Sequence, residues 1–356
     1  MMLAQKDLRA LYCVRLDVQN VNLISSPLTY GFPAVTAFTG FAHAFERWMH
    51  TQAGMEDIGV LGVAVVCHAF DAQISQGGSR HQPKSLKLAR HPNDKEGNPP
   101  PIVEEGRGHM TVSLVFGLGG AGMERHLAAP RAHQDALNQQ WWMQIQSMRL
   151  AGGSVLPARS PHEPLPLLVA WQWPFDIELE SQRRLQKRLL PGFLLQDASE
   201  ILIHHQHWLS KQRGQSIDRL EAWLDLSRLN FSCQEDSEND DEQHDHDDQI
   251  EIETVSKKVQ WRIRPRPDHQ TGWLVPMPLG YAALTDVLPA GTVSGARDNT
   301  VPMCFVEPLL GIGRWVSPHG QVVQRLHEQL WTEHAQPEQG VYQCVQPLRQ
   351  THNQAR

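Results

Sequence analysis

The chain has 356 residues, which is enough for one large domain or two ordinary domains that each bury a hydrophobic core. Its 40% hydrophobic and 20% charged residues are typical of a globular protein and exclude a fibrous chain. No stretch reaches the roughly 18 uninterrupted apolar residues of a membrane-spanning helix, and charges interrupt the N-terminal segment. We therefore expect a cytoplasmic protein without a membrane segment.

The spacing of the cysteines and the distribution of charge indicate which ligands and partners the protein could have. The five cysteines are scattered and never form a CxxC pair, so we predict no disulfide framework, no metal site and no cofactor. The net charge of −7 would oppose nucleic-acid binding, but residues 234–253 hold 11 of the 39 acidic residues and no Lys or Arg. The remainder has 28 acidic and 32 basic residues, a net charge of +4, so nucleic acid stays open as a partner.

The first elements alternate between strand and helix. Residues 8–19 alternate in polarity as a strand does, and a polar turn follows. From Pro33 the pattern becomes helical, with aromatic residues at positions 38, 41, 45 and 48. Residues 58–70 are nearly continuously apolar and Val-rich, which predicts a buried central strand.

A basic excursion interrupts this core pattern. Residues 75–101 are rich in Gly, Pro and positive charge and show no periodicity, so we predict a projecting loop or hairpin. A strand at 110–118, a helix at 134–150 and a strand near 154–156 follow. The order fits an α+β protein with a ferredoxin-like βαββαβ unit, the topology of RNA-recognition modules.

The second half of the chain is less regular. Helical patterns at 178–190 and 217–229 flank another apolar segment, and the acidic stretch follows. Such a run of like charges predicts a solvated, disordered loop. From residue 257 the pattern indicates strands and Gly/Pro turns, with a final helix around 320–334.

Two kinds of segment could contact nucleic acid. The basic excursion carries Arg80, Lys84, Lys87 and Arg90, and positive charges of this kind suit a phosphate backbone, although a solvated surface loop explains them equally well. Two turns carry amide, hydroxyl and glycine residues that could read base edges or ribose hydroxyls. Turn formation and helix capping explain these residues about as well. The residues of the first turn are Asn20, Asn22, Ser25 and Ser26, and those of the second turn are Arg149, Gly152, Gly153 and Ser154.

Catalytic signatures are missing from the sequence. It contains no GxSxG, HExxH, Walker loop or strand-linked GxGxxG motif. His68 lies in an apolar strand, where a hydrogen-bonded core histidine is the favoured interpretation. His109, next to a glycine that follows Arg107, is the histidine that stays open as a functional residue.

Motifs along nearly the whole chain resemble one family, the Csy-two proteins of type I-F CRISPR systems, which belong to the Cas-five class. They are QNVNLISSPLTYGFPAVTAFTGF (19–41), AQIS (72–75), IVEEGRGH (102–109), MRLAGGSVLP (148–157), RRLQKRLLPGF (183–193), GWLVPMPLGY (272–281), GARD (295–298) and WVSPH (315–319). The acidic stretch and residues 161–173 match no motif of the family, so we assign them no role.

The resemblance implies an RNA-binding core with a protruding thumb, for which the basic excursion has the right position. It divides the chain into an RNA-recognition-like core (1–157, with the thumb at 75–109), a helical accessory region (158–233), the acidic loop (234–256) and a C-terminal α/β region (257–356). The predicted RNA-binding residues are those of the two turns, the four thumb cations, and Gln73, Arg107 and His109.

The resemblance also implies partners and the absence of catalysis. The protein would hold the 5′ handle of the guide RNA (crRNA), pair with a large Csy-one subunit of the Cas-eight class, and abut a backbone subunit of the Cas-seven class. Target DNA would be met through the assembled complex. One alternative is a metal-independent endoribonuclease that processes guide precursors with His109 or His68 as base. A structural adaptor without RNA contact is another, but it leaves the basic thumb unexplained.

Overall fold

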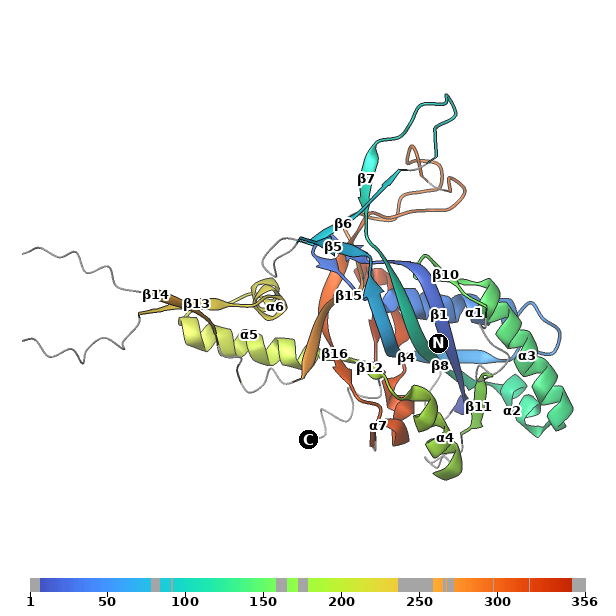
Figure 1. Cartoon of the computed structure of the whole chain (residues 1–356). Helices are drawn as coiled ribbons and strands as arrows, with labels where there is room; N and C mark the ends of the chain where they lie inside the picture. The colour runs from blue at the N-terminus through green and yellow to red at the C-terminus, as the bar shows by residue number, and fades with distance from the viewer. Residues whose placement is uncertain are drawn as a thin grey trace, which may run out of the picture. The chain divides into compact units, whose positions relative to one another are not determined.

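The computed structural model describes residues 7–77, 84–90, 92–157, 165–171, 179–235, 259–264, 267, 272–296, 298–319 and 321–347. The chain divides into two compact units, Met1–Ala198 with Gly272–Arg356, and Ser199–Thr271. The region predicted as helical and accessory is therefore shared between the units, because its first part packs with the N-terminal core. Figure 1 shows the elements of both units.

An antiparallel sheet organises the first unit and confirms a mixed α and β fold. Its strand order is β17-β18-β15-β16-β12-β4-β8-β1-β10-β9, and β11 pairs with β1. The strands are β1 (Leu8–Asn22), β4 (Gly59–Ala72), β8 (Arg107–Gly119), β9 (Arg149–Leu150), β10 (Gly153–Val155), β11 (Leu167–Ala170), β12 (Phe193–Asp197), β15 (Trp273–Ala283), β16 (Val306–Val316), β17 (Thr332–Gln336) and β18 (Val341–Val345).

The N-terminal part of this sheet follows the predicted order of elements. Helix α1 (Val35–Met49) connects β1 to β4, and α3 (Arg131–Ser147) connects β8 to β10. Strands β4, β8, β1 and β10 are neighbours in that order, and each pair is antiparallel. A short helix that the sequence did not predict, α2 (Ala121–Ala128), begins directly after β8, where Gly120 turns the chain with a φ of 91°.

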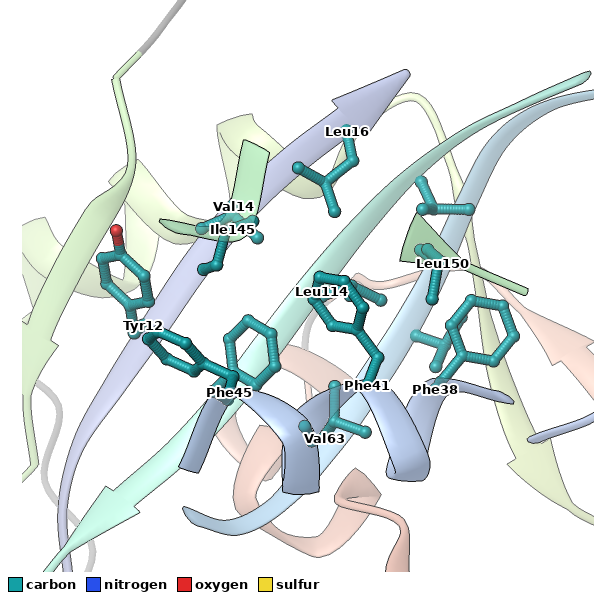
Figure 2. Close-up of a cluster of buried hydrophobic side chains, with 14 of the residues drawn as sticks. Tyr12, Val14, Leu16, Phe38, Phe41, Phe45, Val63, Leu114, Ile145 and Leu150 are labelled. Carbon is teal, nitrogen blue, oxygen red and sulfur yellow. The ribbon is translucent and has the colours of Figure 1, made fainter. Parts of the chain in front are cut away.

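One face of the sheet packs against α1 and α3. Alternate residues of β1 point to this face, and the aromatic residues of α1 meet them because their spacing places them on one side of the helix. Figure 2 shows this cluster, in which β1 contributes Tyr12, Val14 and Leu16 and α1 contributes Phe38, Phe41 and Phe45. Burying one such side chain stabilises the fold by about 1.5–3 kcal/mol.

The opposite face is covered over only part of its length. Leu11 and Cys13 of β1 pack there against Leu185 and Leu189 of α4 (Leu179–Leu189). Further along β1 on the same face, Arg15 is exposed. The sheet therefore has an apolar, covered half and a polar, open half on this side.

Three short strands form the projecting thumb. Strands β5 (Ile74–Gln76), β6 (Lys84–Arg90) and β7 (Ile102–Glu105) pair in that order, all antiparallel. Figure 1 shows β7 and the connection that precedes it extending beyond the end of β8. A small hairpin, β2 (Ile24–Ser26) with β3 (Thr29–Tyr30), follows β1.

The predicted C-terminal helix is mostly wrong. Only α7 (Gln321–Gln324) and a 3-10 turn, η2 (Leu326–Gln329), are helical, and the chain then becomes extended. Trp331 explains the change, because its backbone exchanges two hydrogen bonds with Val63 and its buried indole N–H donates to Leu195 O at 3.1 Å. A further 3-10 turn, η3 (Pro337–Gln339), connects β17 to β18.

The second unit contains two helices and a hairpin. Helices α5 (Ser199–Arg213) and α6 (Arg219–Ser227) precede strands β13 (Phe231–Glu235) and β14 (Val259–Ile263), which pair antiparallel. Residues 234 and 235, predicted as part of the acidic loop, belong to β13. The rest of the predicted loop lies outside the described residues.

Candidate nucleic-acid interface

Strands β1, β4 and β8 bring polar side chains together at one end of the sheet. A bulge in β1 holds Asn20 in the left-handed region with a φ of 57°, which Asn tolerates better than most residues. Gln73 Nε2 donates to Asn20 Oδ1 at 3.1 Å and lies 2.8 Å from His109 Nε2. The backbone N–H of Asn20 donates to His109 Nδ1 at 3.4 Å. The three predicted residues therefore form one cluster.

Arg107 of β8 adds a positive charge to this cluster. Its Nη1 donates to Asn20 O at 3.4 Å, and its Nε donates to Glu105 Oε2 at 3.1 Å. A guanidinium carries five N–H groups in a planar fork that matches a phosphate, and these two bonds use two of them. Glu105 thus holds the side chain in place while leaving donors for a ligand.

The hairpin of β9 and β10 lies directly against β1. Its turn uses positive φ angles at Ala151 (51°) and Gly152 (76°), and Arg149 Nη2 donates to Gly152 O. A Cβ at Gly153 would lie 2.5 Å from Gln19 O, so only glycine permits this approach. The predicted second turn therefore docks beside the first.

Ser154 lies exposed within the same hairpin. In the sheet register it is opposite Gln19 of β1 on one side and Arg149 of β9 on the other. Its hydroxyl is therefore presented between the two turns that the sequence singled out.

A groove of about 500 Å³ lies between this hairpin and α1. Its α1 wall consists of Phe41 and of small residues, Thr36, Gly40 and Ala44 among them, and a Cβ at Gly40 would meet no atom within 4 Å. Arg149 and Tyr281 of β15 also line it. We did not predict Tyr281 or the α1 wall from the sequence. The spacing of small residues at i, i+4 and i+8 was the available signal for the wall.

Three residues of the first turn have local structural roles. Asn22 Nδ2 donates to Ile24 O at 2.7 Å, and Asn22 Oδ1 accepts from Ile24 N–H at 3.2 Å. Ser26 Oγ lies 2.7 Å from Thr29 Oγ1 and accepts from the N–H of residue 28. Ser25 Oγ accepts from Ala34 N–H at 3.2 Å, just before α1. These bonds support the turn and capping interpretation for the three residues.

In the described part of the thumb, glutamates lie beside the predicted lysines. Lys84 and Lys87 are exposed on β6, but β7 places Glu105 directly opposite Lys87 in the ladder and brings Glu104 into the same sheet. Arg80 and the side chain of Arg90 lie outside the described residues. The described side chains of β6 and β7 therefore combine two lysines with two glutamates, and the connection between these strands adds Asp94, Lys95 and Glu96.

The open half of the sheet face carries carboxylates. A depression of about 210 Å³ is lined by Asp17, Asp71, His109 and Thr111, and Thr111 Oγ1 donates to Asp17 Oδ1 at 2.6 Å. Two carboxylates oppose a phosphate backbone. The edge formed by the turns is therefore better suited to RNA than the sheet face itself.

His68 is a hydrogen-bonded structural residue, as predicted. Its Nδ1 lies 2.6 Å from Pro191 O and its Nε2 lies 2.7 Å from Ser113 Oγ. Burial lowers the pKa of His68 below its ordinary value, in spite of the bond with Pro191.

In the part of the chain that the structure describes, no three His, Cys, Asp or Glu side chains could hold a metal ion. None of the described helices has the length and apolar character to cross a membrane.

The fold and the site define an antiparallel α+β protein that gathers amide and guanidinium groups at one edge of its sheet. Comparison with known proteins gives its family. A family model described as CRISPR-associated protein (Cas_Csy2) matches residues 11–344. The CRISPR-associated protein Csy2 of Pseudomonas aeruginosa (strain UCBPP-PA14) is 40% identical over 336 residues, which cover 94% of each chain. The chain therefore belongs to the Csy2 family, which confirms the resemblance found in its motifs.

Proposed function

We propose that this protein is a non-catalytic subunit of a type I-F CRISPR surveillance complex and binds the 5′ handle of the guide RNA. The observation that carries the proposal is the cluster of Asn20, Gln73, Arg107 and His109 at the strand ends, with Arg149 on the docked hairpin beside it. Amide and imidazole groups can read unstacked bases, and guanidinium groups can bind phosphates.

The strand order supports an RNA-recognition-like core. In a ferredoxin-like unit, four antiparallel strands are arranged with the two helices on one face. Strands β4, β8, β1 and β10 with α1 and α3 have this arrangement. RNA-recognition modules bind RNA on the other face, but here α4 covers half of it and Asp17 and Asp71 line the rest. We therefore place the guide RNA along the turn edge and the groove beside α1.

The proposed partners follow from family membership. The large Csy-one subunit of the Cas-eight class and a backbone subunit of the Cas-seven class are the protein partners, and target DNA is met through the assembled complex. The thumb, with Lys84 and Lys87 exposed on β6, separates the handle from the spacer part of the guide in this proposal.

The endoribonuclease alternative is less well supported by the geometry. Both ring nitrogens of His68 are engaged, with Pro191 O and Ser113 Oγ. Both nitrogens of His109 also have partners, Asn20 N–H and the Gln73 side chain. A general base needs a free nitrogen within reach of the ribose hydroxyl and a cation at the phosphate. We therefore favour binding without cleavage.

Incubation of the purified chain with labelled repeat RNA, with and without EDTA, tests the proposal. We expect a retained, intact RNA that a scrambled handle competes for poorly. Specific cleavage that His109→Ala abolishes would support the enzyme instead. Equal binding of handle and scrambled RNA would contradict handle recognition.

A further inference from the structure

A second pocket lies between the small hairpin of β2 and β3 and the base of the thumb. Its volume is about 460 Å³, within the range of ligand pockets, which is roughly 300–1,000 Å³. Most of its walls are apolar, and two charged side chains of the thumb also line it. The side chains that give the pocket its character are Ile24, Leu28, Tyr30, Leu86, Lys84 and Glu104.

The hairpin exposes large apolar side chains to this pocket. Leu28 and Tyr30 are each 57% exposed, and Ile24, directly opposite Tyr30 in the register, is 41% exposed. None of the three belongs to the hydrophobic core clusters of the described residues. An exposed aromatic ring with apolar neighbours offers a flat face on which any nucleobase can stack. The hairpin therefore has the features of a stacking platform.

The two charged side chains indicate which kind of base fits. Lys84 is an exposed cation that suits a phosphate, and the Glu104 carboxylate is an acceptor only. Adenine, cytosine and guanine each carry an amino group on the Watson–Crick edge, which can donate to a carboxylate. Uracil carries one N–H between two carbonyl oxygens, which a carboxylate repels. The pocket therefore suits a nucleotide whose base has an amino group.

The pocket is continuous with the cluster proposed to bind guide RNA. Gln73 and Arg107 of the cluster lie one and three residues from Ile74 and Glu104 of the pocket. The chain from β1 to β2 joins the two sites as well, because the Leu23 N–H donates to Gly106 O at 2.9 Å. An RNA strand that lies along the cluster therefore passes the pocket. This continuity favours guide RNA over any other occupant.

We propose that this pocket holds one unstacked base of the guide RNA and selects a base that carries an amino group. The base stacks on the Tyr30 ring, its amino group donates to the Glu104 carboxylate, and a neighbouring phosphate lies at Lys84. The inference rests on the proposed binding of guide RNA. It adds two residues, Tyr30 and Glu104, that determine specificity at a single position of that RNA.

A set of abasic RNAs tests the stacking contact. Each handle RNA lacks one base in turn, and fluorescence anisotropy gives its affinity for the unmodified chain and for Tyr30→Ala. At one position, loss of the base should weaken binding to the unmodified chain at least about fivefold, the lower end for stacking on an aromatic side chain. The same loss should have no effect in Tyr30→Ala, because the stacking partner is already absent.

Two further variants serve as controls. Tyr30→Phe keeps the ring, so it should retain the effect at that position. Phe193→Ala removes a 46% exposed aromatic side chain outside the pocket and should leave the whole set of affinities unchanged. Because Tyr30 is exposed and lies outside the core, the circular dichroism spectrum of Tyr30→Ala should be normal.

The role of Glu104 is tested at the position that the abasic RNAs identify. Uracil at this position should weaken binding to the unmodified chain at least about fivefold, as for a mismatched base contact. Glu104→Ala should remove the preference, whereas Glu104→Gln keeps an acceptor oxygen and should retain part of it. The ratio of the two affinities is the readout, because a uniform gain from removing a negative charge cancels in it.

Several outcomes would overturn the inference. They are an abasic set in which no position depends on Tyr30, a coupled position that holds uracil in the natural handle, and a base preference that survives Glu104→Ala. Normal RNA affinity of Tyr30→Ala with weaker retention of a protein partner would show a protein contact instead. Equal binding of handle and scrambled RNA by the unmodified chain would contradict the proposed function itself, so the two failures are distinguishable.

Discussion

Replacing Lys84 and Lys87 by alanine tests whether the thumb grips the guide RNA. Both lysines are exposed on β6, so their loss removes charge without opening the core. Each phosphate contact with single-stranded RNA contributes roughly 0.7 to the slope of log affinity against log salt concentration. Two lost contacts therefore lower the slope by about 1.4. Between 50 and 200 mM salt, the unmodified chain should then lose about sevenfold more affinity than the variant.

The decrease of about 1.4 in the salt slope is an upper bound. Glu105 lies directly opposite Lys87 and neutralises part of its charge, so a decrease between about 0.7 and 1.4 is expected. Fluorescence anisotropy with labelled handle RNA at several salt concentrations measures the slope. Lys211→Ala, which removes an exposed lysine of α5 in the second unit, is the matched control. An unchanged slope in the double variant, with a normal circular dichroism spectrum, would refute the thumb assignment.

Three further changes test other parts of the reasoning. Glu105→Gln removes the carboxylate beside Arg107, so guide RNA affinity should increase in an anisotropy titration; a decrease would show that holding Arg107 in place matters more. Gly153→Ala forces a Cβ against β1 and should lower the free energy of unfolding by about 1–3 kcal/mol in urea denaturation. Burial lowers the pKa of His205, in spite of its 2.8 Å contact with Asp225, so the unfolded chain takes up a proton first as the pH falls. The second unit should therefore lose stability below about pH 6.5, and hydrogen exchange in α5 and α6 should become faster than its intrinsic pH dependence predicts.

The fold was most predictable where one periodicity extends over many residues. The aromatic residues of α1 repeat at helical spacing, and β4 is an uninterrupted Val-rich run, so both elements could be located from the sequence. The end of the chain could not, because residues near Trp331 have a helical pattern but pair with Val63 in the sheet. Long-range backbone pairing overrides local propensity there. The predicted helix was wrong for this reason.

The sequence predicted which residues form the candidate site, but it did not predict how they are arranged. The motifs named Asn20, Gln73, Arg107 and His109, but only the register of β1, β4 and β8 brings them together. The glutamates of the thumb were visible in the sequence, yet their effect on Lys87 depends on the pairing of β6 with β7. Charge counted along residues 79–95 therefore left out Glu105, which the pairing of β6 with β7 places opposite Lys87.

The two asparagines of the first turn should behave differently in spite of their similar sequence context. Both side-chain atoms of Asn22 bond to the backbone of Ile24, so Asn22→Ala should disturb the turn and weaken handle and scrambled RNA equally. The Asn20 amide has one side-chain partner, Gln73, so it keeps donors for a base edge. Asn20→Ala should therefore weaken the handle more than the scrambled RNA, and an anisotropy competition between the two RNAs measures the difference. If Asn20→Ala lowered both affinities by the same factor, the cluster would bind the backbone of the RNA and would not read its bases.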